Sequence, residues 1–127
     1  MLYKLFKFYL NKTDPELAHK FAIKFIKNPL LSSCITPQTI YDNLNQTLFN
    51  LEFSSPIGLA AGFDKNAEIY NYVEKLGFSF SEVGTVTPKP QPGNPMPRVF
   101  RLIDDRAIIN RLGFPNDGME IIKRRMK

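Results

Sequence analysis

Apolar residues recur with a helical period in the N-terminal part of the chain. In residues 1–10 they form a broad apolar arc with lysines on the other side. Between residues 17 and 26 they repeat in i, i+4 pairs on one face, and lysines crowd the opposite face. Thr13 or Asp14 can cap this second helix, and the proline that follows suits a first turn. The pattern predicts a small amphipathic helical hairpin over residues 1–27.

The pattern changes in the middle of the chain. Residues 28–47 are rich in polar residues and proline, which predicts a linker with a helical turn near residues 39–44. Residues 48–53 are typical of an extended segment. The continuous apolar run at residues 56–61 predicts a strand buried on both faces, as parallel sheets require.

The rest of the chain alternates strand and helix signals. Apolar spacing predicts a helix over residues 68–76, capped by Gly77, and then a strand over residues 78–83. Residues 84–97 contain five prolines, so we expect irregular structure there. The last predicted elements are two short strands, 98–102 and 107–110, turned at Asp104-Asp105, and a helix over residues 116–127. This order is typical of an α/β fold with a parallel sheet.

Length and charge narrow the classes of function. The chain has 127 residues and a net charge of +5, much of it at the two ends. The basic, aromatic N-terminus favours an anionic surface such as a membrane, and no basic stripe or recognition motif indicates a nucleic acid. The simpler explanation of the basic C-terminal end is a solvated helix terminus favoured by the helix dipole.

Cysteine and histidine content excludes two further classes. Cys34 and His19 are single residues of their type, so neither a disulfide framework nor a multi-histidine metal site is expected, and no metal is predicted. No apolar run approaches the roughly 20 residues that a membrane span needs, and the N-terminus lacks signal-peptide features. We therefore expect an intracellular protein.

Candidate chemistry is densest in residues 57–65, which read Ile-Gly-Leu-Ala-Ala-Gly-Phe-Asp-Lys. Small residues at the end of a strand let a flat ligand approach the backbone, and Lys65 can hold a carboxylate or an electron-rich ring. Residues 82–94 place a Gly-Thr pair after the next strand, and residues 110–114 place an asparagine after another. Each segment can equally be an ordinary turn, and the two alternatives stay open on spacing alone. No P-loop, dinucleotide fingerprint or nucleophile elbow occurs.

In this order and spacing, the segments resemble the quinone-dependent (class 2) dihydroorotate dehydrogenases. The resemblance runs from about Tyr3 to about Gly118. Its most specific parts are residues 14–19, 56–65, 82–94, 97–102 and 109–114. The implied architecture is an incomplete β/α (TIM-type) barrel over residues 48–127, preceded by the linker and by the helical hairpin. A complete barrel of this type needs roughly 250 residues.

The resemblance also implies a set of site residues. Contacts to FMN are implied for Ala61, Gly62, Phe63, Asp64, Lys65 and Thr85. Contacts to the substrate, dihydroorotate or orotate, are implied for Lys65, Asn110, Arg111, Leu112, Gly113 and Phe114. The two N-terminal helices would form a tunnel for ubiquinone, with His19 and Arg101 near it. The family's catalytic base is a serine in a later loop, so no catalytic residue is expected in this chain.

Two positions depart from the family pattern: Ala67 stands where glycine is usual, and Pro115 replaces an asparagine close to the substrate.

We expect the chain to be an N-terminal fragment of an enzyme of de novo pyrimidine (UMP) biosynthesis. Alone it is expected to be inactive and unable to bind FMN tightly. We expect it to be peripheral on the cytoplasmic face of the membrane. A second chain carrying the rest of the barrel would complete it. The alternative is a membrane-surface or partner-binding remnant without catalysis, in which His19 is an ordinary half-buried histidine.

Overall fold

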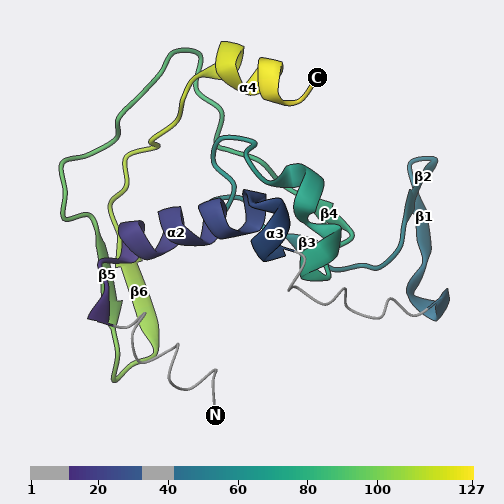
Figure 1. The fold of residues 1–127 in the computed structure, drawn as a ribbon, viewed down its shortest axis with the longest axis horizontal. Helices are drawn as coiled ribbons and strands as arrows, with labels where there is room; N and C mark the ends of the chain where they lie inside the picture. Colours follow the sequence, from purple (N-terminus) through teal and green to yellow (C-terminus); the bar gives the residue numbers. More distant parts are fainter. Residues whose placement is uncertain (1–11, 33–41) are drawn as a thin grey trace.

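The computed structural model describes residues 12–32 and 42–127 (Figure 1). Its strands form three separate two-stranded sheets, β1-β2, β3-β4 and β5-β6. The helices, in chain order, are α2 (Pro15–Lys27), α3 (Pro29–Ser32), η1 (Asp42–Leu44), η2 (Tyr70–Tyr72), η3 (Glu74–Leu76) and α4 (Met119–Arg125). The strands are β1 (Gln46–Leu48), β2 (Leu51–Phe53), β3 (Gly58–Leu59), β4 (Phe80–Ser81), β5 (Val99–Leu102) and β6 (Ala107–Asn110).

The second predicted N-terminal helix is confirmed as α2. The Asp14 side chain caps it by accepting the Leu17 N–H at 2.9 Å, and Pro15 opens the first turn. The helix ends at Lys27, directly before Asn28 and Pro29. The first predicted helix, over residues 1–10, lies outside the described residues. No helix in the described part of the chain is long and apolar enough to cross a membrane.

The prediction of one extended segment over residues 48–53 is wrong, because these residues belong to a hairpin. The chain turns back at Phe49-Asn50, both with positive φ (53° and 61°), and β1 pairs antiparallel with β2. Two residues with positive φ make the tight turn whose twist suits a hairpin, and asparagine tolerates that conformation. The turn of the hairpin points away from the other described elements in Figure 1, while the Phe53 ring at the end of β2 meets the Phe80 ring of β4 edge to face at 5.5 Å. Strand β1 begins inside the segment predicted as a linker.

The predicted parallel pairing is confirmed in β3 and β4, with Gly58 opposite Phe80 and Leu59 opposite Ser81. The strands are shorter than predicted, and burial on both faces is wrong, because Ile57 and Phe80 are exposed. Neither strand has a second neighbour among the described residues, so each is covered on fewer sides than a strand inside a wider sheet.

The predicted helix over residues 68–76 is instead two short 3-10 helices, η2 and η3. The Asp64 carboxylate accepts the backbone N–H groups of Glu68 and Ile69, each at 2.8 Å, so this turn begins on a side chain. Gly77 ends the segment with φ 86°, as predicted for the cap. The β5-β6 hairpin, its turn at Asp104-Asp105 and the irregular loop over residues 84–97 are confirmed.

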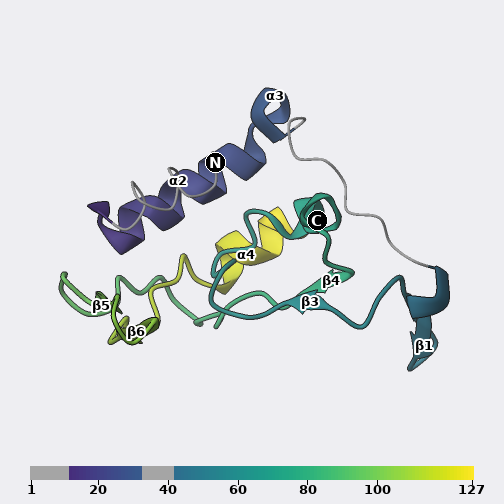
Figure 2. The same cartoon turned by 90° about the horizontal axis from the view of Figure 1, so that it is seen from below.

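The described core lies where α2 crosses the rest of the chain (Figure 2). Ile23 and Ile26 of α2 pack with the fully buried Ile69, and Leu59 and Phe63 cover the cluster. Apolar contact thus fixes α2 over the loop that follows β3. The structure is an α/β fragment, and the predicted helical hairpin is described only in its second helix.

Candidate functional site

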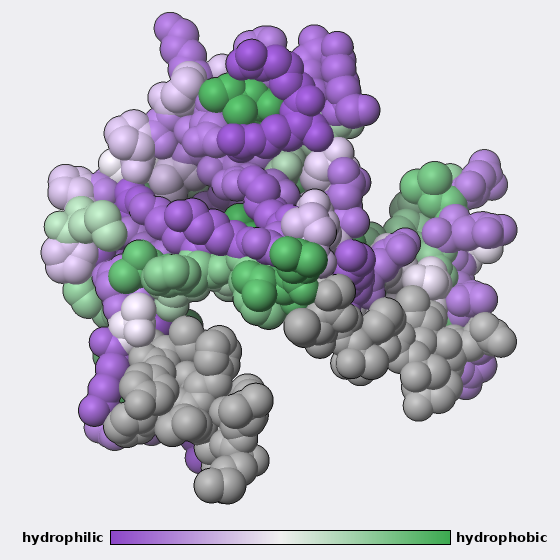
Figure 3. Space-filling model, in the orientation of Figure 1, coloured by the Kyte–Doolittle hydropathy of each residue, from purple (hydrophilic) through white to green (hydrophobic). Residues whose placement is uncertain are grey.

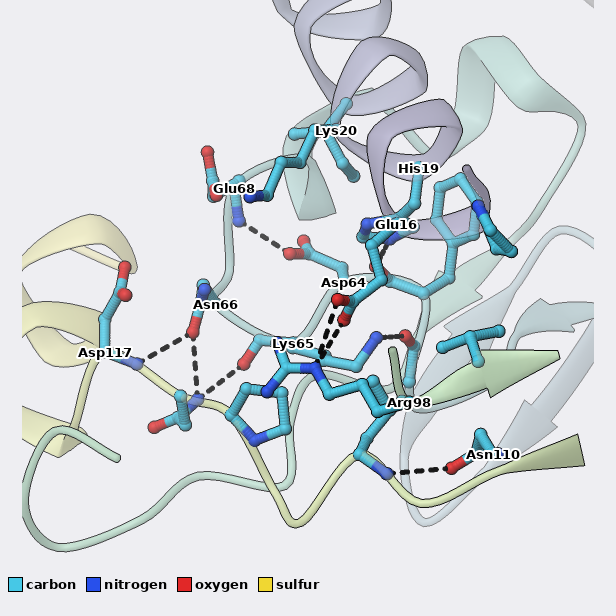
Figure 4. A pocket seen from close by; sticks show the side chains of 18 of the residues that line it. Glu16, His19, Lys20, Asp64, Lys65, Asn66, Glu68, Arg98, Asn110 and Asp117 are labelled. Atoms are coloured by element: carbon cyan, nitrogen blue, oxygen red, sulfur yellow. Dashed lines mark hydrogen bonds and ion pairs between the residues drawn. The ribbon is translucent and has the colours of Figure 1, made fainter. Parts of the chain in front are cut away.

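A cavity of about 620 Å³ lies between α2, the loop after β3 and the β5-β6 hairpin (Figure 4). The sequence-predicted residues that line it are His19, Gly62, Phe63, Asp64, Lys65, Asn110 and Leu112. These residues come from three separate parts of the chain. The fold therefore brings the predicted flavin loop and the first residues of the predicted substrate segment to one cavity, beneath α2.

Lys65 lies half-buried at the centre of this group. Its ammonium donates a hydrogen bond to the Gly62 carbonyl oxygen, which folds the lysine back over its own loop. Burial lowers the pKa of Lys65 below its ordinary value; the Glu16 carboxylate opposes this effect and the Arg98 guanidinium adds to it. The lysine is therefore a cation donor held in place, near a carboxylate that α2 supplies.

The backbone of the loop before Lys65 faces open space. Gly62 has φ 95°, and no heavy atom beyond its chain neighbours lies within 4 Å of the position where a side chain would begin. The Gly62 N–H donates to the Gly84 carbonyl at 3.2 Å, and the Gly84 N–H donates to the Asp64 carbonyl at 3.1 Å. These bonds hold Gly84, which precedes the exposed Thr85, against Gly62, which follows the exposed Ala61. A flat ring could approach such a surface closely.

Two predicted loop residues have structural contacts instead of open faces. The Asp64 side chain is 1% exposed and is fully used in capping the following turn. The Phe63 carbonyl contacts His19 Nε2 at 2.7 Å, and the two rings meet edge to face at 5.2 Å. His19 thereby joins α2 to the predicted flavin loop.

The predicted substrate segment is divided by the structure. Asn110 and Leu112 line the cavity, whereas the Arg111 side chain donates to the Pro97 carbonyl at 3.1 Å. The Gly113 carbonyl accepts a bond from the Gln91 side chain at 2.9 Å, and Phe114 is exposed outside the cavity lining.

Arg101, the other residue predicted near the quinone tunnel, does not line the cavity either. It donates to the Thr13 carbonyl at 2.5 Å and so ties β5 to the start of α2. His19 lies on α2 itself, whereas Arg101 bonds the residue before the cap of that helix, so the two lie at different places along it.

A model of the family described as "Dihydroorotate dehydrogenase" matches residues 43–127. The chain belongs to the dihydroorotate dehydrogenase family. Among curated relatives, the "Dihydroorotate dehydrogenase (quinone)" of Rhizobium rhizogenes is 51% identical over 114 residues, which are 90% of this chain and 31% of that protein. The protein of the same name from Rhizobium etli is 54% identical over 114 residues, 89% of this chain and 31% of that protein. The chain thus spans about 31% of the length of these relatives.

Solved dihydroorotate dehydrogenase structures also match. The Eimeria tenella structure described as a complex with ferulenol superposes with a TM-score of 0.80 at 47% identity, over 89% of this chain and 30% of that one. The structure of the ligand-free type from the same organism gives the same TM-score and identity, over 31% of its length. The described backbone therefore superposes on part of the fold of a TIM-barrel family.

Sequence reasoning missed the residue that ties these dihydroorotate dehydrogenase segments together, Asn116. Its amide is 5% exposed; Oδ1 accepts the N–H groups of Thr87 (3.0 Å) and Gly118 (2.9 Å). Its Nδ2 donates to the Lys65 carbonyl at 2.7 Å and to the Asn66 side chain at 3.0 Å. We call these five residues the Asn116 cluster. An asparagine at the start of a helical pattern predicts only a cap, so periodicity gave no signal for this role.

Glu16 and Arg98 were missed as well. They lie in two of the segments that carry the family resemblance, but the sequence predicts a site role for neither; Glu16, three residues after Thr13, is predicted only as part of a capping box. Figure 4 shows them paired across the cavity, between α2 and the strand β5 region. In the described ranges, 12–32 and 42–127, no group of His, Cys, Asp or Glu side chains is arranged to hold a metal ion.

Proposed function

We propose that this chain supplies the flavin- and substrate-facing first part of a quinone-dependent dihydroorotate dehydrogenase, which oxidises dihydroorotate to orotate. One observation carries the proposal: Lys65 and Asn110, from segments far apart in sequence, line one cavity. A lysine and an amide beside an open glycine backbone suit a planar, anionic substrate stacked on a flat ring.

In this proposal the surface formed by Ala61, Gly62 and Thr85 holds the ring of FMN, and Lys65 lies at its edge. The chemistry that FMN would supply here when bound is a hydride acceptor for dihydroorotate and an electron donor to ubiquinone, while the proton lost with the hydride would go to the serine base that the resemblance implies in a later loop. Lys65 would hold the substrate's carboxylate and place the substrate against the ring, and the Asn110 amide would bond its polar edge. The Asn116 amide bonds the Lys65 carbonyl and the Asn66 side chain, so the backbone that carries the lysine is positioned before any ligand arrives.

The first prediction concerns flavin and a second chain. The chain alone is expected to bind FMN weakly or not at all, because the resemblance implies glycines for the flavin phosphate in later segments that match no position among these 127 residues. Co-expression with the remaining barrel segment of the Rhizobium rhizogenes relative is expected to give a yellow complex with one FMN and dihydroorotate-dependent quinone reduction. Absorbance near the flavin bands and a quinone-reduction assay measure both.

The matched control is the remaining barrel segment expressed without this chain. Stoichiometric FMN on the 127-residue chain alone would contradict the first half of the prediction. A well-folded complex that binds no FMN and oxidises no dihydroorotate would contradict the proposed function.

We also propose that α2 lies against a membrane surface, on its cytoplasmic face, and carries the quinone entrance near His19 and Arg101. Figure 3 shows apolar side chains gathered along one side of α2. Leu17, Phe21 and Phe25 are exposed there, while its lysines are exposed beside them. A helix with this division can lie in the interface of an anionic bilayer. The remnant hypothesis shares this surface but has no catalysis.

The second prediction tests that surface. The chain is expected to co-sediment with vesicles that contain anionic lipid more strongly than with neutral ones, and salt is expected to weaken the difference, because lysines near an anionic surface contribute about 1 kcal/mol each. Replacing Phe21 and Phe25 by serine should abolish binding to both kinds of vesicle. Serine at Ile108 and Ile109, exposed on the β5-β6 hairpin, is the matched control. Equal binding by both variants would refute a role for α2.

A further inference from the structure

The Glu16–Arg98 ion pair joins α2 to the segment before β5, across 82 residues of sequence. Arg98 Nε donates to Glu16 Oε1 at 2.8 Å and to Oε2 at 3.1 Å. The two side chains are only 13% and 15% exposed, so solvent and salt screen their attraction little. The second ion pair from α2 to the body, Lys27–Glu68 at 2.8 Å, is 45% and 29% exposed. Glu16–Arg98 is therefore the better shielded of the two.

Arg98 also holds the proline-rich loop with its remaining donors. Its Nη1 donates to the Pro92 carbonyl at 2.6 Å and to the Asn94 carbonyl at 2.9 Å. A guanidinium is a rigid plane, so fixing Nε on a carboxylate also fixes where Nη1 can donate. Gly93 lies between these carbonyls, where an added Cβ would stand 2.7 Å from Arg98 Nη1 and overlap the Leu112 carbonyl. The loop is thus closed tightly around the arginine.

The same loop is hydrogen-bonded to the predicted substrate segment. The Asn94 N–H donates to the Leu112 carbonyl at 2.9 Å, and the Asn94 side chain donates to the Arg111 carbonyl at 2.7 Å. In return, the Arg111 N–H donates to the Arg98 carbonyl at 2.8 Å. A continuous path of hydrogen bonds therefore runs from the Glu16 carboxylate to the backbone of residues 111–112.

We propose that Glu16 and Arg98 are a positioning pair through which the placement of α2 fixes the geometry of residues 110–112, and thereby the binding of substrate at the cavity. The assignment of residues 110–112 to the substrate rests on the proposed function; the mechanical link does not. Since α2 carries the exposed apolar face, the state of that face is coupled to the substrate segment through this pair.

Amide hydrogen exchange on the 15N-labelled chain tests the link without flavin or substrate. Glu16→Gln keeps the size of the side chain and removes its charge. It is expected to speed exchange at the Asn94 and Arg111 amides about tenfold, because a hydrogen bond to a charged group is lost and the loop opens locally. The Thr87 and Gly118 amides, bonded to Asn116, should be unchanged. Glu68→Gln, the matched change in the more exposed pair, should leave Asn94 and Arg111 unchanged.

Unchanged exchange at Asn94 and Arg111 in Glu16→Gln would overturn the proposal, as would an equal acceleration at every protected amide, which marks a general loss of stability. If Glu16→Gln does not fold, exchange of the unmodified chain in rising urea decides instead. Asn94 and Arg111 should lose protection together with the α2 amide of Ala18. Protection at Asn94 that outlasts α2 would refute the coupling.

A kinetic arm separates this inference from the proposed function. In the complex with the remaining barrel segment, Glu16→Gln is expected to raise KM for dihydroorotate about tenfold and to change kcat less. Glu16→Asp, which keeps the charge, should recover part of the loss. A wild-type complex without activity would refute the proposed function and leave the exchange result standing. An active complex with equal KM in both proteins would refute the positioning role.

Discussion

The Lys65→Ala variant of the reconstituted complex is expected to lose about a hundredfold or more in the rate of dihydroorotate oxidation. In the proposed site the Lys65 ammonium is a charged donor beside the open glycine backbone, already held by burial and by its bond to Gly62. Removing one such preorganised donor costs about 10²–10³ in rate in comparable sites. Quinone reduction under saturating dihydroorotate measures the effect.

Lys89→Ala is the matched control, because Lys89 is exposed on the proline-rich loop and does not line the cavity. It should retain full activity and FMN content. Normal turnover in Lys65→Ala with FMN still bound would remove Lys65 from the proposed site.

The lowered pKa of Lys65 gives this prediction a direction in pH. The ammonium should lose its proton at a lower pH than a lysine with the ordinary pKa near 10.5. As the pH is raised, KM for the anionic substrate should therefore increase at a lower pH than an ordinary lysine would give. Glu16→Gln removes the carboxylate that supports the charge and should move this rise to lower pH. Between the two pKa values the unfolded chain binds one more proton at Lys65, so the contribution of Lys65 to stability increases with pH there.

The Asp64→Ala variant is expected to lower the free energy of unfolding by about 3 kcal/mol. Its buried carboxylate accepts two backbone N–H groups, and each donor left without a partner costs about 1–3 kcal/mol. Urea unfolding followed by circular dichroism measures the change. Asp64→Asn keeps one acceptor oxygen, so its free energy of unfolding should lie between those of the unmodified chain and Asp64→Ala.

The control for Asp64 is Asp105→Ala, in the exposed turn of the β5-β6 hairpin, where a change within about 0.5 kcal/mol is expected. An Asp64→Ala loss no larger than that of the control would show that the turn before η2 does not depend on this carboxylate.

The elements that the sequence predicts correctly are those with local signals. Asp14 and Pro15 start α2, Gly77 ends η3, and two adjacent aspartates mark the turn between β5 and β6. The helix predicted over residues 68–76 differs because its N–H groups bond three residues back, as from Tyr72 to Ile69 and from Leu76 to Val73, and apolar spacing does not separate this pattern from an α-helix. The hairpin at residues 46–53 was missed because Phe49 is apolar and hides a turn inside an extended pattern.

The candidate site divides in the same way. The loop from Gly62 to Lys65 follows β3, and Asn110 ends β6, so the positions of both could be predicted from the order of elements. The roles of Asn116 and of the Glu16–Arg98 pair depend on contacts between residues many positions apart, which no period or cap records. Local composition also could not show which face of α2 packs against Ile69 and the loop after β3. Ile23 and Ile26 pack there, and Phe21 and Phe25 remain exposed.

The Asn116 cluster has a consequence for how the protein ages. Asp117-Gly118 is a sequence at which aspartate readily cyclises to a succinimide and then gives isoaspartate, because the glycine nitrogen is unhindered. In this structure that nitrogen is engaged by Asn116 Oδ1 at 2.9 Å, and the Asp117 carboxylate is paired with Arg125 at 2.7 Å. Both reacting groups are occupied, so the cyclisation must wait until the cluster opens. Stored protein should therefore accumulate isoaspartate in proportion to the fraction of molecules in which this part of the chain is locally unfolded.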